Sequence, residues 1–213
     1  MRATRLLALA LVGLIAPLSR SAAQTCEGSA AFQDGRMRVG AFYQDNSDRN
    51  DVGAQLAFGI PRSFFGTLTL DSRYFPSTPQ TPPINTVNTS KSSYLGGGAE
   101  LGYQIHLSDT PFQVCPAVSW HVADGGQGSE FGFGGSIGYR VPISTWLITV
   151  PAVGVRWLNS TEPSAPARSY DNVFMAMGLV FNNTLTIQPG LAVPSPTGSK
   201  TIYTIAVSIN WWK

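Results

Sequence analysis

The sequence predicts an all-β protein, folded as an up-and-down antiparallel β-barrel of about ten strands, with eight strands as the alternative. Apolar and polar residues alternate with a period of two through most of the chain, which is typical of strands whose two faces have different surroundings. No long window shows a sustained helical period, and no apolar run after residue 23 approaches the 18 residues that a membrane helix needs. The links between the alternating segments are short and long in turn, as expected when a chain runs up and down one sheet.

Residues 1–23 predict a signal peptide. Arg2 and Arg5 precede an apolar run over residues 6–16, and a Ser-Ala-Ala sequence ending at Ala23 is the kind that a signal peptidase accepts. The run is too short to cross about 30 Å of hydrocarbon as a helix. The predicted parts are a signal peptide (1–23), an N-terminal segment (24–35) and the barrel itself (36–213).

The composition excludes two classes of protein. The chain has 22 glycines and 15 prolines, but it is 43% hydrophobic and 11% aromatic, which excludes simple disorder. Charged residues make up only 12%, about half the usual share of a soluble domain. Without the three arginines of residues 1–23, 11 basic residues face 12 acidic ones, a net charge of −1. Such a chain has no basic surface for a phosphate backbone, so nucleic acid is not an expected partner.

The segment 51–60 illustrates the alternation. Leu56 and Phe58 fall on one face, and Gly53 and Gln55 fall on the other. The same pattern predicts strands near residues 36–45, 51–60, 65–75, 93–107, 112–123, 130–143, 146–158, 172–182, 184–193 and 201–212.

The links predict where the loops lie. Short links fall at residues 61–63, 108–111, 144–145 and 182–183, and the pair Asn182-Asn183 is a candidate for a tight hairpin turn. Longer links, rich in Pro, Ser, Thr, Asn and Gly, fall at residues 46–50, 76–92, 124–129, 159–171 and 194–200. All short links therefore lie at one end of the sheet and all long ones at the other.

The polar face of the strands indicates that the apolar face is the outer one. That polar face carries Gly, Ser, Ala, Thr and Gln with few charges, whereas a water-exposed sheet face usually carries Lys and Glu. A membrane barrel has an apolar outer band between two rings of aromatic residues and a polar lumen. The residues predicted to point toward lipid are Leu56, Phe58, Leu101, Ile105, Val118, Val153, Ile205 and Ile209. The predicted aromatic rings are Tyr103, Phe112, Tyr139, Trp146 and Trp211 at the short-link end, and Tyr43, Tyr74, Trp120 and Trp157 at the long-link end.

The signal peptide, the even number of strands, the two kinds of link and a last strand ending in Trp211-Trp212 together resemble the small, porin-like outer-membrane β-barrel proteins of diderm bacteria. The resemblance covers nearly all of the mature chain and includes no functional motif. It implies the cell outer membrane as the location, with outer-membrane lipid and the barrel-assembly machinery as partners. The resemblance indicates no ligand for the long links. Lys213 departs from the pattern, because such barrels usually end on the aromatic residue that the assembly machinery recognises.

A barrel with its apolar face outside turns a set of charged residues into the lumen. The predicted lumen residues are Arg38, Asp71, Arg73, Glu100, His106, Arg140 and Arg156. Arg73 and Glu100 lie at similar distances from the short-link end and are predicted to face each other across neighbouring strands. Such a pair forms either a solute-selective constriction or a charged plug inside a narrow, largely occluded barrel.

The two cysteines predict a disulfide between Cys26 and Cys115. They are the only cysteines in the chain, and a signal peptide directs them to an oxidising compartment. Cys115 falls on the inward phase of its strand near the short-link end, where the N-terminal segment also begins. The bond would hold that segment across the periplasmic mouth.

The expected function is that of a small integral outer-membrane protein with a structural, surface-interaction or limited solute-passage role, and not an enzyme. One alternative is a hydrolase acting at the extracellular mouth through Ser119, His121 and Asp124. Another is a soluble periplasmic ligand-binding barrel with its apolar face inside. His106 stands apart from other ligand types, and the cysteines lack metal-site spacing, so no metal or cofactor is expected.

Overall fold

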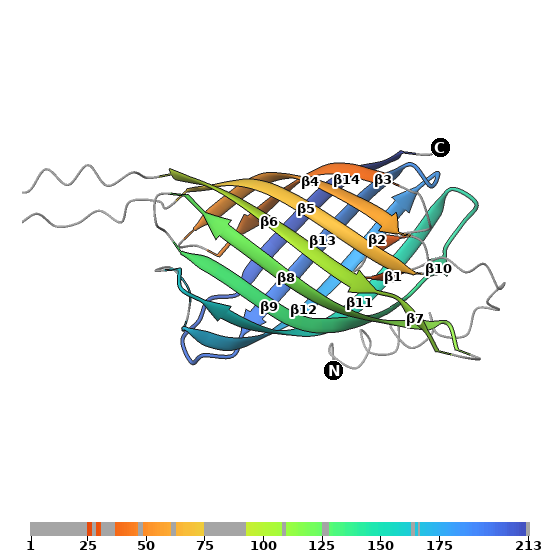
Figure 1. The fold of residues 1–213 in the computed structure, drawn as a ribbon. Coiled ribbons are helices and arrows are strands. Elements are labelled where there is room, and N and C mark those ends of the chain that lie inside the picture. Colours follow the sequence, from red (N-terminus) through yellow and green to blue (C-terminus); the bar gives the residue numbers. More distant parts are fainter. Residues whose placement is uncertain are drawn as a thin grey trace, which may run out of the picture.

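The computed structural model describes residues 25–26, 29–30, 37–46, 49–60, 63–74, 93–107, 110–124, 128–162, 165 and 167–211. Ten long strands form a closed antiparallel barrel (Figure 1). They are β3 (Met37–Asp45), β4 (Asn50–Ile60), β5 (Phe64–Tyr74), β6 (Ser93–Tyr103), β8 (Phe112–Ala123), β9 (Ser129–Tyr139), β11 (Leu147–Ser160), β12 (Ser169–Phe181), β13 (Leu185–Pro194) and β14 (Ile202–Trp211). Each pairs with the next along the chain, and β14 pairs with β3 to close the ring. The prediction of ten strands is confirmed. No helix among the described residues is long and apolar enough to span a membrane.

Two predicted strands, 93–107 and 130–143, are interrupted near the short-link end. Tyr103, the last residue of β6, is opposite Phe64, the first residue of β5, and the backbone N–H of Gln104 donates to the carbonyl of Ser63 at 2.9 Å, which extends this pairing by one position. Beyond it, β7 (Ile105–His106) pairs with β8. β9 ends at Tyr139, opposite Phe112, the first residue of β8, and β10 (Val141–Pro142) pairs with β11. Each break therefore falls where a neighbouring strand ends.

The predicted tight turn lies between β12 and β13. Asn182 and Asn183 both have a positive φ, 49° and 56°, and the N–H of Thr184 donates to the carbonyl of Phe181 at 2.9 Å. Two central residues with positive φ define the type I′ turn that suits a twisted hairpin, and asparagine tolerates this region better than most residues.

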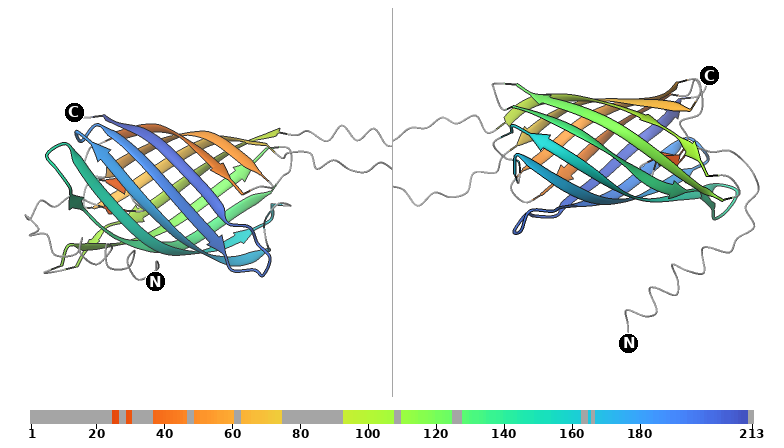
Figure 2. Two further views of the ribbon diagram at one scale, coloured as in Figure 1. Left: turned by 180° about the vertical axis from the view of Figure 1, so that it is seen from behind. Right: turned by 60° about the horizontal axis from the view of Figure 1, so that its bottom comes forward.

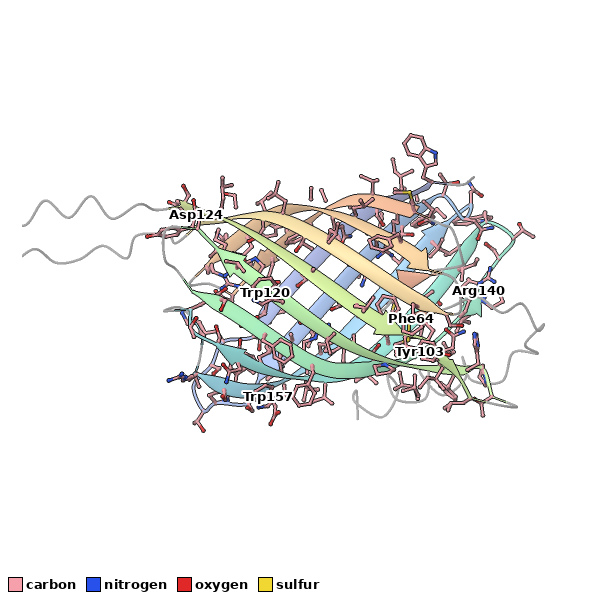
Figure 3. All side chains as sticks on the ribbon, in the orientation of Figure 1. Phe64, Tyr103, Trp120, Asp124, Arg140 and Trp157 are labelled. Atoms are coloured by element: carbon pink, nitrogen blue, oxygen red, sulfur yellow. A yellow bond between two sulfur atoms is a disulfide. The ribbon has the colours of Figure 1, made fainter. Side chains whose placement is uncertain are left out.

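The apolar face of the strands points outward, as predicted. Six of the eight predicted lipid-facing residues are exposed: Leu101, Ile105, Val118, Val153, Ile205 and Ile209. Leu56 and Phe58 lie on the same face but are half-buried, and the Phe58 ring occupies the space that a side chain at Gly66 would fill. Figure 3 places Trp120 and Trp157 toward the long-link end, and Phe64 and Tyr103 toward the short-link end.

A short hairpin from the N-terminal segment lies inside the barrel near its short-link end. It consists of β1 (Thr25–Cys26) and β2 (Ser29–Ala30). β1 contacts β8, β9 and β11, while β2 contacts β12 and β13 on the other side, so the hairpin crosses the lumen (Figures 1 and 2). The predicted signal peptide and the rest of residues 24–35 lie outside the described residues.

The predicted disulfide joins this hairpin to the wall. Cys26 on β1 and Cys115 on β8 are bonded, with their Cα atoms 5.6 Å apart. Both are fully buried, in a cluster with Ala57, Phe65 and Ala117. The inward phase of Cys115 and the position of the N-terminal segment are therefore confirmed.

Candidate functional site

Six charged side chains form a buried network in the lumen toward the long-link end. We call Arg49, Asp51, Asp71, Arg73, His121 and Glu162 the charge network. They come from β4, β5 and β8 and from the links before β4 and after β11. Antiparallel pairing places Asp51 directly opposite Arg73, and period-two alternation turns both into the lumen.

Two arginines of the network are each held by two acids. Arg73 donates from Nε to Asp71 Oδ2 at 3.0 Å and from Nη1 to Glu162 Oε2. Arg49 donates from Nη2 to Asp51 Oδ2 at 2.9 Å, and its Nη1 lies 3.4 Å from Glu162 Oε2. All five side chains are largely shielded from solvent. Charges in such surroundings must be paired, because an unpaired buried charge costs several kcal/mol.

The imidazole of His121 bridges two acids. Its Nε2 lies 2.7 Å from Asp71 Oδ1, and its Nδ1 lies 3.3 Å from Glu162 Oε1. Ionised carboxylates only accept hydrogen bonds, so the ring satisfies both acids when both nitrogens carry protons. Arg73 Nη2 lies 2.8 Å and 3.0 Å from the two ring nitrogens. With His121 protonated, three cations oppose three anions, and the charge network is neutral.

Two glycines of β6 make room for this ring. A Cβ added at Gly96 would lie 2.7 Å from His121 Cε1 and 2.9 Å from Asp71 Oδ2. A Cβ at Gly98 would lie 2.8 Å from Thr69 Oγ1 and 3.2 Å from His121 Cδ2. The inward glycines of β6 thus provide the space in which His121 of β8 meets Asp71 of β5.

Glu162 closes the network from the link between β11 and β12. Its backbone N–H donates to Ser160 Oγ at 3.2 Å, and its carbonyl accepts from the N–H of Ala165 at 3.1 Å. Burial disfavours ionisation, but the hydrogen bond from His121 and the charges of Arg73 and Arg49 outweigh it, so the pKa of Glu162 is lowered. The carboxylate is therefore firmly ionised at neutral pH.

A second ion pair crosses the lumen. Arg156 Nη2 on β11 donates to Glu100 Oε2 on β6 at 2.6 Å, although two strands separate β6 from β11 in the sheet. The Arg156 guanidinium also lies 5.8 Å from the ring centre of Phe174, which rests against Gly154.

The predicted Arg73–Glu100 pair is wrong. Arg73 is opposite Tyr94, whereas Glu100 is opposite Thr67, six positions lower on β5, or about 20 Å along the strand. The pair was predicted from a single strand over residues 93–107, in which Glu100 lies about as far from the short-link end as Arg73 does on its own strand. The ladder of β6 ends at Tyr103, so Glu100 lies much closer to the short-link end.

The other predicted lumen residues divide between the interior and the rim. Arg38 is buried and lines the lumen. His106 is exposed on β7, where its Nδ1 lies 3.2 Å from Gln113 Nε2. Arg140 follows β9 at the short-link end (Figure 3). The last two belong to the rim, because β6 and β9 end before them.

The sequence prediction missed Arg49, Asp51 and Glu162. Asp51 has the same phase as Gly53 and Gln55, so the alternation contained the signal that it points inward. Arg49 and Glu162 lie in links, where no period applies, and only the path of the chain brings them into the lumen.

The possible hydrolytic residues do not converge. Both ring nitrogens of His121 face carboxylates and Arg73, so neither is turned to accept a proton from Ser119. Asp124 is exposed at the rim, where its Oδ1 accepts from the backbone N–H of Leu95 at 3.2 Å. Among the described residues, no three His, Cys, Asp or Glu side chains are grouped so that they could hold a metal ion.

Two adjoining cavities occupy the lumen. The inner cavity, which we call the chamber, has a volume of about 410 Å³ and reaches Cys26 of the hairpin. The outer cavity, the vestibule, has a volume of about 540 Å³ and is bordered by the links of the long-link end. Residues that line both cavities include Gln44, Arg49, Glu130, Arg156, Asn172 and Thr204. These shared residues mark the neck between the two.

Comparison with known proteins finds similarity in structure alone. No family model matches the chain, and no curated protein matches it in sequence. The N-terminal β-barrel domain of OprF from Pseudomonas aeruginosa is 7% identical, with 84% of this chain and 98% of that chain covered and a TM-score of 0.39. LpxR from Salmonella typhimurium is 8% identical, with 86% of each chain covered and a TM-score of 0.48. An outer membrane channel from Pseudomonas putida F1 is 8% identical, with 92% of this chain and all of that chain covered and a TM-score of 0.42. These three TM-scores are below 0.5, so what the chain does must follow from its own surface and lumen.

Proposed function

We propose that this chain is a small integral outer-membrane β-barrel protein, not an enzyme, whose resting lumen does not let solutes pass through and whose role is structural or in surface interaction. The observation that carries this proposal is the closed barrel with apolar residues around its outside and buried charges within. Isolated apolar side chains are common on soluble proteins, but a continuous apolar band is not. A closed barrel also satisfies every backbone group between its strands, as lipid requires.

The proposed orientation places the short links in the periplasm and the long links outside the cell. The predicted signal peptide supports export. Short periplasmic turns and longer outer loops are usual for outer-membrane barrels. This orientation also puts the Cys26–Cys115 bond in an oxidising compartment.

Three features support a lumen that is closed to the passage of solutes. The hairpin crosses the short-link end, the Glu100–Arg156 pair spans the interior, and the charge network ties β5 and β8 to the link after β11. A barrel of ten strands is near the size that side chains can fill.

Membrane integration and conductance test the proposal separately. The protein should remain in the outer-membrane fraction after alkaline extraction and should migrate differently on a denaturing gel before and after boiling. In planar bilayers it should show small or absent conductance. Release by alkali would contradict the membrane assignment, whereas a large, stable conductance would contradict the closed lumen alone.

A further inference from the structure

We propose that the chamber is a binding site for a small, neutral, polyhydroxylated molecule that enters through the vestibule. This inference deepens the proposed function, because it rests on a barrel that is closed at the hairpin end and open to ligands at the long-link end. A cavity that is closed at one end suits binding and release through one mouth better than passage.

Charge compensation argues for a neutral ligand. Arg73 and His121 are held by Asp71 and Glu162, and Arg156 is held by Glu100. A charged solute would have to compete with these internal pairs and leave one partner buried without its counter-charge. The pairs therefore act against ions of either sign.

Unpartnered polar atoms argue for a ligand with hydroxyl groups. Gln55 Nε2, Asn172 Oδ1 and Asp51 Oδ1 are buried without a hydrogen-bond partner, and all three residues line the chamber. The first is a donor and the other two are acceptors. A hydroxyl group donates and accepts, so one kind of functional group satisfies all three atoms.

At the neck, the wall formed by β3 and β14 presents uncharged polar groups, and deeper in the chamber this wall has an apolar side. Gln44 and Thr204 are opposite each other on β3 and β14, and both line the neck. Phe42 lies against Gly53 and lines the chamber, where its ring offers a flat apolar surface. Amide and hydroxyl groups beside an aromatic face match a molecule with polar edges and apolar C–H faces, such as a sugar ring. The chamber volume lies within the range of small-ligand pockets.

Calorimetry on the purified full chain in detergent, with glucose, maltose and maltotriose as probes, tests the inference. At least one of these sugars should bind, and the charged analogues glucuronate and glucosamine should bind at least about tenfold more weakly. Gln55→Ala and Asn172→Ala should each weaken binding about three- to tenfold, the usual effect of one lost hydrogen bond. Ala192→Trp should abolish binding by filling the neck, since Ala192 lines both cavities. Ser72→Ala, on the outer face of β5, should change nothing.

The result separates this inference from the proposed function. Each variant is first checked for the shift in gel mobility on boiling, which reports an intact barrel. If a correctly folded barrel binds none of the three sugars, the chamber holds water only and the inference is overturned while the membrane assignment stands. Equal affinity for neutral and charged probes, or unchanged affinity in both alanine variants, would overturn it as well.

Discussion

At the scale of single residues, the charge network depends on two glycines of β6 that have no side chain. Gly96 and Gly98 have no side chain where His121 must lie to reach Asp71. Inward glycines weaken a strand, because they cost conformational entropy and offer nothing to pack. Here they allow an imidazole from one strand to meet an acid two strands away.

Gly96→Ala should therefore destabilise the barrel by about 1–3 kcal/mol, as overpacking usually does, because the added methyl displaces His121 from Asp71. The matched control is Gly97→Ala on the same strand, whose Cβ would meet only the Thr69 carbonyl oxygen, at an ordinary 3.4 Å. Urea unfolding in lipid vesicles measures both. Equal losses in the two variants would show that the space for His121 does not decide the effect.

The pH dependence of stability should depend on Glu162. The pKa of Glu162 in the folded protein is lowered from the ordinary value of a glutamate, which is about 4.3 in an unfolded chain. The ionised carboxylate therefore stabilises the fold above that pH, and this contribution is lost as the pH falls through the folded pKa. Glu162→Gln should cost about 1–3 kcal/mol at pH 7, where hydrogen bonds to a charged group are lost, and the difference in unfolding free energy from the native protein should narrow as the pH falls through the lowered pKa of Glu162. A gap independent of pH would exclude ionisation of Glu162 as the cause.

At the scale of elements, the hairpin β1–β2 occupies the barrel because one covalent bond holds it there. It offers only two residues per strand, too few for a stable hairpin in isolation. The disulfide joins positions 89 residues apart, so it strongly restricts the unfolded chain.

Replacing both cysteines by serine should cost up to about 4–5 kcal/mol in the chain-entropy model and should release the hairpin from β8. The expected readouts are a lower unfolding free energy and a rise in single-channel conductance. Cys115→Ser alone should match the double variant, because either change breaks the same bond. Unchanged conductance in a folded barrel would mean that side chains, and not the hairpin, close the lumen.

At the scale of the whole molecule, the apolar residues face outward and the charges face the interior. A soluble periplasmic barrel would have its charges outside and its apolar side chains inside, because water solvates charged groups and disfavours exposed apolar ones. Lipid removes the penalty for exposed Leu, Val and Ile and adds one for exposed charge.

Leu70→Arg, at an exposed position near the middle of β5, should therefore cost about 2–4 kcal/mol in lipid. Tyr74→Arg, on the same face at the end of the strand, should cost only about 0–1 kcal/mol, because an arginine there reaches the interface. Unfolding in vesicles compares the two. A Leu70→Arg protein as stable as the Tyr74→Arg protein would contradict the lipid-facing assignment of this surface.

Local patterns in the sequence determined most of the architecture. Period-two alternation requires only neighbouring residues, so it identified the strands and the outward face, and two consecutive asparagines identified the turn at 182–183. The disulfide could be predicted because the chain has only two cysteines, so each has a single possible partner within the chain.

The tertiary structure alone decided the charge network. Register fixed Glu100 opposite Thr67, and strand ends moved His106 and Arg140 to the rim, which no count along a single segment reveals. Glu162 entered the lumen from a link, where conformation depends on the closed barrel around it. Whether a side chain points inward or outward depends on one strand alone, whereas ion pairs across a lumen depend on how ten strands close into a barrel. For that physical reason the sequence predicted the strands of the barrel but not the charge network inside it.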